Sequence, residues 1–199
     1  MPKKILAING SYRRGGVTAQ ALAEALAGAR EAGAETETVD LPEIDIKFCT
    51  NCRACTQTPG EGRAACVLED GMASLLDKVD AADGLILAAP VNCFNVTAVT
   101  RRFMERLVVY GYWPWGMAAP KYRITVTGKK AALITSSAMP ALLGRVFTGA
   151  VRALKYTARA VGAKVEGTLF IGLAGMKEHP ELTAAEKGKA RALGRRLAA

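Results

Sequence analysis

Residues 3–20 read KKILAINGSYRRGGVTAQ, and this stretch contains a strand, a tight loop and the start of a helix. Residues 3–9 predict a short buried strand that ends at the turn Gly10-Ser11. Residues 17–32 carry apolar residues at helical spacing, so a helix follows the loop directly. A strand that turns at once into a helix is the first half of a β-α-β unit.

The rest of the chain repeats this alternation. We expect an edge strand at 34–40, further strands at 84–89, 131–135 and 164–171, and helices at 72–79, 97–110, 143–161 and from 181 onward. Such alternation predicts a parallel sheet with helices on both faces, joined by right-handed crossovers. Five strands suit the order 2-1-3-4-5 in a three-layer α/β sandwich.

We expect one domain over residues 1–199, with a cysteine-rich loop at 41–70 and an aromatic insertion at 111–129. The strand-to-helix loops then meet at the carboxyl edge of the sheet, where ligands bind in folds of this kind. These loops are 10–18, 41–70, 90–96 and 136–142.

The bulk composition narrows the function classes. The chain has 199 residues and a formal net charge of +9, but no basic run is interleaved with aromatic residues, which argues against nucleic-acid binding. No segment reaches the ~18 consecutive apolar residues of a membrane span, and the apolar run 5–8 is too short for a signal-peptide core. We therefore expect a cytoplasmic protein.

The first loop has the parts of an anion cradle. Its glycines let the backbone bend, Ser11 and Thr18 carry hydroxyls, and Arg13 carries a positive charge. The N-terminus of the next helix adds free N–H groups and the positive end of its dipole. A plain strand–helix turn is the alternative.

The third loop begins at Pro90 and could present backbone groups to a flat ring. Asn92 and Asn95 could bond the polar edge of that ring, and Phe94 could pack beside it. Alternatively, Asn95 only caps the following helix.

Taken together, these motifs resemble the NADPH-dependent FMN reductases and iron–sulfur flavoproteins of flavodoxin-like fold. The resemblance spans roughly residues 3–172 in order. The matching motifs are Gly10-Ser11-x-Arg13 with Thr18, the cysteine run from Cys49, Glu69-Asp70-Gly71-Met72, Pro90-Val91-Asn92 with Asn95, and Phe103-Met104-Glu105-Arg106.

The resemblance implies a non-covalently bound flavin mononucleotide (FMN). Asn92 replaces a common Tyr of the family, and Val17 replaces a common polar residue, so ring packing and phosphate binding depart from the pattern. The implied phosphate contacts are Ser11, Arg13, Val17 and Thr18, and the implied ring contacts are Pro90, Val91, Asn92, Cys93, Phe94, Asn95, Ser136, Ser137 and Ala138.

Four of the five cysteines are spaced C-x2-C-x2-C-x10-C, as Cys49, Cys52, Cys55 and Cys66. Three thiolates at such short gaps can wrap one iron–sulfur cluster, and the resemblance implies a [4Fe–4S] cluster. The last gap is longer than in the related motif, so Cys66 can be a ligand only if the glycine-rich stretch at Gly60 and Gly62 loops back. A zinc site and free thiols remain open. Cys93 lies on another loop, where we expect it to face the flavin.

Two further features are the aromatic residues around the insertion and the single histidine. Tyr110, Tyr112, Trp113 and Trp115 form an aromatic patch that is either a core plug, a subunit contact or a lid beside the flavin. The single histidine, His179, precedes Pro180 in a late loop and is expected at the surface.

These features predict an FMN-dependent oxidoreductase, in which the flavin does the redox chemistry and the protein supplies position and electrostatics. Electrons would come from NAD(P)H or a ferredoxin-like donor and pass to a quinone, a small electrophile or oxygen. A flavodoxin-type electron carrier and a structural zinc protein are the alternatives. The resemblance also implies a homodimer or homotetramer.

Overall fold

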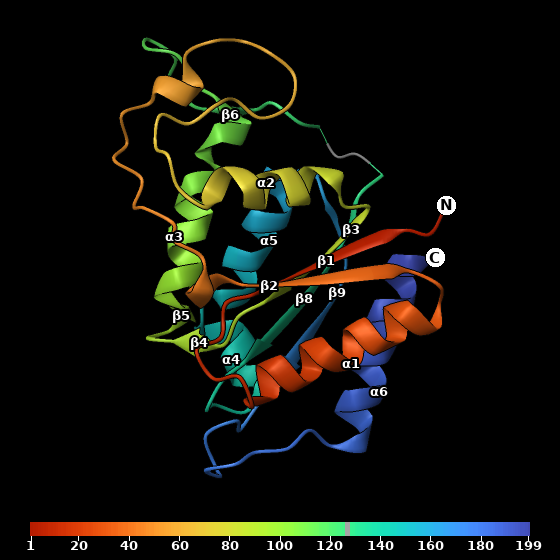
Figure 1. Ribbon diagram of the computed structural model, residues 1–199. Helices are drawn as coiled ribbons and strands as arrows, with labels where there is room; N and C mark the ends of the chain where they lie inside the picture. Colours follow the sequence, from red (N-terminus) through yellow and green to blue (C-terminus); the bar gives the residue numbers. More distant parts are fainter. Residues whose placement is uncertain (126–127) are drawn as a thin grey trace.

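The computed structural model describes residues 1–125 and 128–199, and a five-stranded parallel sheet forms its centre (Figure 1). The order β2-β1-β3-β8-β9 is the predicted 2-1-3-4-5, so the prediction of a flavodoxin-like fold is confirmed. The strands are β1 (Lys4–Asn9), β2 (Glu35–Asp40), β3 (Gly84–Ala88), β8 (Lys130–Ser136) and β9 (Lys164–Ile171).

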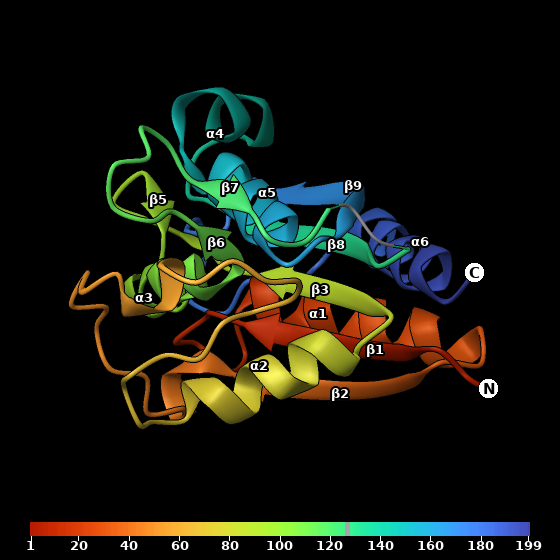
Figure 2. The same ribbon diagram turned by 90° about the horizontal axis from the view of Figure 1, so that it is seen from above.

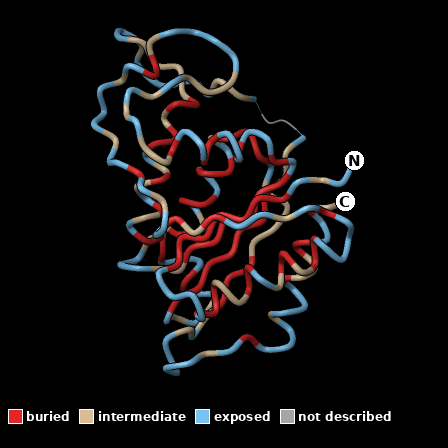
Figure 3. Tube along the Cα trace, viewed as in Figure 1, coloured by how far each residue is buried: buried red, intermediate tan, exposed pale blue. Residues whose placement is uncertain are grey.

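Helices cover both faces of this sheet (Figures 1 and 2). Helices α1 (Val17–Glu31) and α6 (Ala184–Ala198) pack together on one face. Helices α2 (Met72–Ala81), α3 (Ala98–Arg106) and α5 (Ala150–Ala160) lie on the other. Buried residues concentrate in the central strands between these two layers (Figure 3).

Alternating side chains of each central strand supply the two cores. In β1, Ile5 and Ala7 pack towards α1 and α6, whereas Leu6 and Ile8 pack towards α2, α3 and α5. Successive side chains of a strand point to opposite faces, so a strand covered on both sides must be apolar throughout. This is why β1 and β3 read as continuous apolar runs.

The predicted helix 143–161 is wrong in one respect, because the segment forms two helices, α4 (Ala141–Phe147) and α5. The break falls at Thr148, whose backbone is extended and whose hydroxyl donates to the Gly144 carbonyl at 2.6 Å. The Gly149 amide leaves the helical pattern and donates to the Phe94 carbonyl at 2.8 Å. A contact from a distant loop therefore interrupts a segment with continuous helical spacing.

The loops also contain short elements. The cysteine-rich loop holds 3₁₀ turns at Leu41–Glu43 and Ala54–Thr56, and α3 continues into the 3₁₀ turn Leu107–Tyr110. The predicted insertion 111–129 contains a hairpin of β6 (Gly111–Tyr112) and β7 (Lys121–Tyr122), while its positions 126 and 127 lie outside the described residues. Within the described ranges, no helix is both long and apolar enough to span a membrane.

Helices α1 and α6 approach each other closely where each carries a glycine. A Cβ atom at Gly194 would lie 1.8 Å from the Ala25 carbonyl oxygen, and one at Gly28 would lie 2.2 Å from the Arg191 carbonyl oxygen. Backbone atoms cannot move aside as a flexible side chain can, so this helix pair requires glycine at its crossing.

We therefore expect Gly194→Ala to destabilise the protein by about 1–3 kcal/mol, because the helices must separate to admit the methyl group. Urea unfolding followed by circular dichroism measures the change. Gly188→Ala, on the same helix with nothing within 4 Å of its Cβ, is the matched control. It should stabilise the helix by about 0.5–1 kcal/mol. Equal effects of the two substitutions would contradict this account of the packing.

Candidate cofactor site

Hydrogen bonds fix the turn at the carboxyl end of β1. The Asn9 side-chain amide donates to an Asp40 carboxylate oxygen at 2.6 Å, and the Ser11 backbone N–H donates to Asn9 Oδ1 at 3.0 Å. The Arg13 N–H then donates to Ser11 Oγ at 3.2 Å. The buried Ser11 is thus held just beyond the sheet edge.

The loops after β1 and β3 touch at Gly10. A Cβ atom there would lie 1.8 Å from Thr100 Oγ1, and the Thr97 hydroxyl donates to the Gly10 carbonyl at 2.7 Å. Thr97 also caps α3, since its hydroxyl accepts a hydrogen bond from the Thr100 N–H. Asn95 is therefore not the cap of this helix.

The N-terminus of α1 faces the same region without a capping side chain. Its N-cap is Gly16, none of the described side chains caps it, and its first turn contains no acidic residue. Thr18 in this turn is buried and its hydroxyl lies 2.8 Å from Ser136 Oγ. Free amides, a positive dipole end and paired hydroxyls are the features that bind a phosphate.

A cavity of about 310 Å³ opens between these loops. Most of the residues predicted for FMN line it: Ser11, Arg13, Val17, Thr18, Pro90, Val91, Asn92, Ser136, Ser137 and Ala138. Sequence reasoning missed other lining residues, namely Tyr12, Gly16, Ala174, Gly175 and Pro180. The last three follow β9, whose carboxyl end lies at the same sheet edge. The predicted strand order could have indicated that the loop after this strand also lines the cavity.

Cys93, Phe94 and Asn95 are not among the residues that line this cavity. Strands β4 (Val91–Asn92) and β5 (Asn95–Val96) form a hairpin, and its two turn residues have φ of 46° at Cys93 and 63° at Phe94. Positive φ at both central residues is the pattern of a type I′ hairpin turn. Both side chains are exposed.

The cysteine-rich loop brings four thiols into one neighbourhood. Cys55 is buried, Cys49 and Cys66 are half-buried, and Cys52 is exposed. Burial raises the pKa of the Cys55 thiol, and the nearby thiols of Cys66, Cys49 and Cys52 raise it further. Within 1–125 and 128–199, however, no three Cys, His, Asp or Glu side chains are placed to hold a single metal ion.

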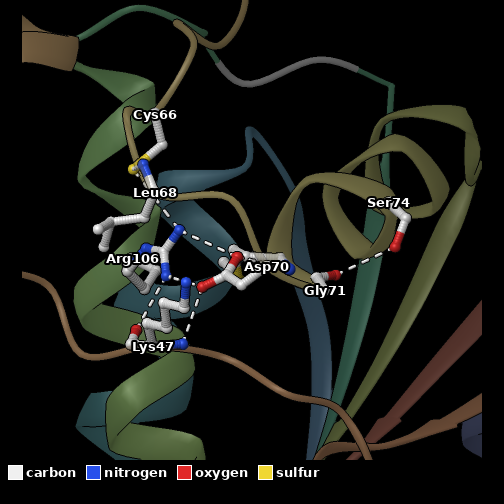
Figure 4. Close-up of polar contacts among 8 residues, drawn as sticks. Lys47, Cys66, Leu68, Asp70, Gly71, Ser74 and Arg106 are labelled. Carbon is white, nitrogen blue, oxygen red and sulfur yellow. Dashed lines mark hydrogen bonds and ion pairs between the residues drawn. The ribbon is translucent and has the colours of Figure 1, made fainter.

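A buried ion pair anchors the end of this loop (Figure 4). The side chains of Arg106 on α3 and Asp70 before α2 are 2% and 0% exposed and contact each other directly. Asp70 also accepts the backbone N–H groups of Lys47 at 2.8 Å and Met72 at 2.9 Å. Burial alone would raise the pKa of Asp70, but the bonds from Arg106 and these two amides lower it below its ordinary value.

The same guanidinium reaches Cys66. Cys66 Sγ accepts two hydrogen bonds at 3.5 Å, one from Arg106 Nη2 and one from the Leu68 backbone N–H (Figure 4). Arg106 Nη1 donates to the Lys47 carbonyl at 2.9 Å. One buried arginine therefore joins α3 to the start and the end of the cysteine run.

The aromatic patch lies against the cysteine loop. The Trp113 backbone N–H donates to the Thr56 carbonyl at 2.9 Å, and the buried Tyr110 donates its hydroxyl to Asp80 at 2.7 Å. None of the four aromatic residues lines the cavity at the sheet edge. His179 is exposed, as expected.

Comparison with known proteins agrees with this geometry. The sequence profile of the NADPH-dependent FMN reductases matches residues 3–165, which is most of the chain. The chain belongs to this family. It is 35% identical over 111 residues to an iron–sulfur flavoprotein of Archaeoglobus fulgidus, an alignment that covers 56% of this chain and 48% of that one.

A second iron–sulfur flavoprotein, from Methanosarcina thermophila, is 36% identical over 106 residues, covering 53% of each chain. The chain thus spans about half the length of these relatives. Among solved structures, the NAD(P)H:quinone oxidoreductase from Methanothermobacter marburgensis superimposes with a TM-score of 0.72 at 17% identity, over 99% of this chain and 100% of that one. At this identity the structural match supports the shared fold alone.

The Asp70–Arg106 pair should make stability depend on pH. A carboxylate with a lowered folded pKa stabilises the protein above its unfolded pKa of about 3.9, and this contribution is lost as pH falls through the folded value. Asp70→Asn should therefore cost about 3–5 kcal/mol near neutral pH, because Arg106 stays buried without its counter-charge. Urea unfolding of both proteins from pH 7 down to pH 2 should show the difference shrinking below about pH 4. A difference that is constant with pH would contradict the ion-pair account.

Proposed function

We propose that this protein is an FMN-dependent oxidoreductase whose flavin occupies the cavity at the carboxyl edge of the sheet. The cavity itself carries this proposal, because it combines an uncapped helix N-terminus with buried hydroxyls. Its volume of about 310 Å³ lies in the range of small-molecule sites. The family match supports FMN as the ligand.

In this proposal the two sides of the cavity have different roles. The α1 amides, Ser11 and Thr18 bind the phosphate, and Arg13 adds a charge-assisted hydrogen bond. Pro90, Val91 and Asn92 contact the ring on one side, with Ser136, Ser137 and Ala138 from the loop after β8. Bound FMN supplies hydride and electron transfer, while these residues hold it in place and limit its exposure to water.

We propose NAD(P)H or a ferredoxin-like protein as electron donor, and a quinone, a small electrophile or oxygen as acceptor. The net charge of +9 favours approach of anionic donors such as NAD(P)H or an acidic protein. Oxidation of NAD(P)H by the purified protein in the presence of a quinone would distinguish an enzyme from a simple electron carrier. We propose a homodimer or homotetramer, because Phe94, Leu142 and Phe147 expose large apolar side chains.

Arg13→Ala should weaken FMN binding by about 1.5–3 kcal/mol, the usual contribution of a hydrogen bond to a charged group. Arg13 lines the cavity, and its Nη2 donates to the Glu178 carbonyl at 2.8 Å, which holds the side chain there. Quenching of flavin fluorescence on titration of the flavin-free protein measures the affinity.

Arg14→Ala is the matched control. Arg14 carries the same charge one position later, but it pairs with Glu43 and does not line the cavity. Its loss should leave FMN affinity nearly unchanged. Unaltered affinity in the Arg13 variant would refute the proposed phosphate contact.

We further propose that Cys49, Cys52, Cys55 and Cys66 hold a [4Fe–4S] cluster. Thiolates are the ligands that such clusters require, and the four thiols gather in one loop. Two relatives named iron–sulfur flavoproteins support this proposal.

Replacing Cys49, Cys52 or Cys55 by Ser should abolish or severely reduce bound iron, because a hydroxyl is a poor substitute for a soft thiolate. Cys66→Ser should do the same if the ten-residue gap closes on the cluster. Cys93→Ser, on the separate β4–β5 hairpin, is the control and should retain iron. Iron and sulfide analysis of protein purified without oxygen gives the readout. Iron lost only from the Cys93 variant would show that the cluster lies on the other loop.

A further inference from the structure

Arg53, inside the cysteine run, is held between two tryptophan rings of the insertion. Its guanidinium carbon lies 3.9 Å from the centroid of Trp113 and 4.0 Å from that of Trp115. A planar guanidinium stacks on aromatic faces as an ammonium cannot. The stack thus joins the short segment between Cys52 and Cys55 to a part of the chain about sixty residues away.

Hydrogen bonds orient the stacked guanidinium. Arg53 Nη2 contacts the Trp113 carbonyl and donates to the Pro114 carbonyl at 3.3 Å. Its Nε is buried and has no hydrogen-bond partner among the described residues. Burying this one nitrogen of a partly buried arginine without a partner has a cost, which the two ring contacts offset.

The backbone of the cysteine run is strained at the same place. Asn51 has φ of 53° and Arg53 has φ of 61°, so both neighbours of Cys52 are in the left-handed region. Residues other than glycine adopt this region at a cost and keep it only where their surroundings enforce it. The Arg53 stack is such a constraint, since it fixes the side chain of one of the two strained residues.

Further hydrogen bonds bind the insertion to the cysteine run. The Trp115 N–H donates to Gln57 Oε1 at 3.1 Å, and the Thr56 hydroxyl donates to the Trp113 carbonyl at 3.1 Å. Beyond the tryptophans, Arg123 donates to the Cys55 carbonyl at 3.1 Å and to the Gly111 carbonyl at 3.0 Å. The contacts thus extend from Arg53 past Cys55 to Gln57.

We propose that Arg53, Trp113 and Trp115 form a clamp that positions the cysteine run for its metal cluster. Arg53 is a positioning residue in this clamp, because it holds the backbone between two cluster ligands without being a ligand itself. The inference rests on the proposed [4Fe–4S] site and gives the aromatic insertion a role there. The stack forms without any cluster ligand, so it does not depend on the cluster, and such preorganisation of a site strengthens binding.

Thiol labelling of the cluster-free protein tests the clamp without using activity. Cys55 is only 7% exposed, so iodoacetamide should alkylate it slowly in the wild type. Trp115 is 68% exposed, so Arg53→Gln and Trp115→Leu should each accelerate its labelling by roughly 2- to 5-fold, the size of one lost cation–π contact at an exposed site. Peptide mass spectrometry resolves the rate at each cysteine.

The direction of this effect separates the clamp from a simple charge effect. Loss of a nearby positive charge disfavours the thiolate and would slow alkylation, whereas opening of the loop accelerates it. Arg159→Gln is the matched control, because that arginine stacks on a single ring, Tyr122, at 5.0 Å and lies on α5. Iodoacetamide should label Cys55 of this variant at the wild-type rate. Arg53→Lys keeps the charge but not the planar stack, so Cys55 in this variant should be labelled nearly as fast as in Arg53→Gln.

Anaerobic reconstitution with ferrous iron and sulfide is the second readout. The clamp variants should retain less iron than wild type and release it faster to a chelator, by about 10- to 100-fold, as when other outer-sphere contacts are lost. Unchanged Cys55 labelling in both Arg53→Gln and Trp115→Leu would overturn the clamp. Normal iron retention despite fast labelling would overturn its role in positioning the cluster. Wild-type protein that labels slowly but takes up no iron would instead refute the cluster assignment.

Discussion

Parallel pairing of β1 with β2 on one side and β3 on the other is the constraint on which the rest of the structure depends. In a parallel sheet every strand ends at the same edge, so the loops that follow the strands lie together there. The glycine-rich loop after β1, the hairpin after β3 and the loops after β8 and β9 meet there for this reason. Gly10 lets the loop after β1 approach the start of α3, since a Cβ atom there would lie 1.8 Å from Thr100 Oγ1.

The cysteine loop follows β2, the edge strand, and has the sheet on one side only. It needs other anchors, and the structure provides two. The buried pair Asp70–Arg106 fixes the ends of the loop to α2 and α3, and the Arg53 stack fixes its middle to the insertion. Both anchors use arginine, whose planar fork can satisfy several carbonyl or carboxylate oxygens at once. The proposed flavin site thus depends on the pairing of the parallel strands, whereas the proposed cluster site depends on arginine side chains that anchor the cysteine loop.

Much of this arrangement could be predicted before the structure was known, and the exceptions have physical causes. Apolar runs at 5–8 and 84–89 predict buried strands, and their order predicts which loops meet. The break at Thr148 could not be seen, because helical spacing continues through it and the interrupting contact comes from Phe94. The outward turn of Cys93 and Phe94 depends on a hairpin whose residues lack the usual Asn-Gly signal.

The sequence by itself determined the fold class, the strand order, the position of the glycine- and hydroxyl-rich loop after β1 and the grouping of four cysteines, because these follow from local periodicity and residue chemistry. The tertiary structure decided which residues that follow β9 line the cavity. It also decided that the aromatic insertion packs on the cysteine loop and not beside the cavity. It also decided that Arg106 joins Asp70 to Cys66. These contacts link residues tens of positions apart, and their energies depend on burial and orientation, which exist only once the chain has folded.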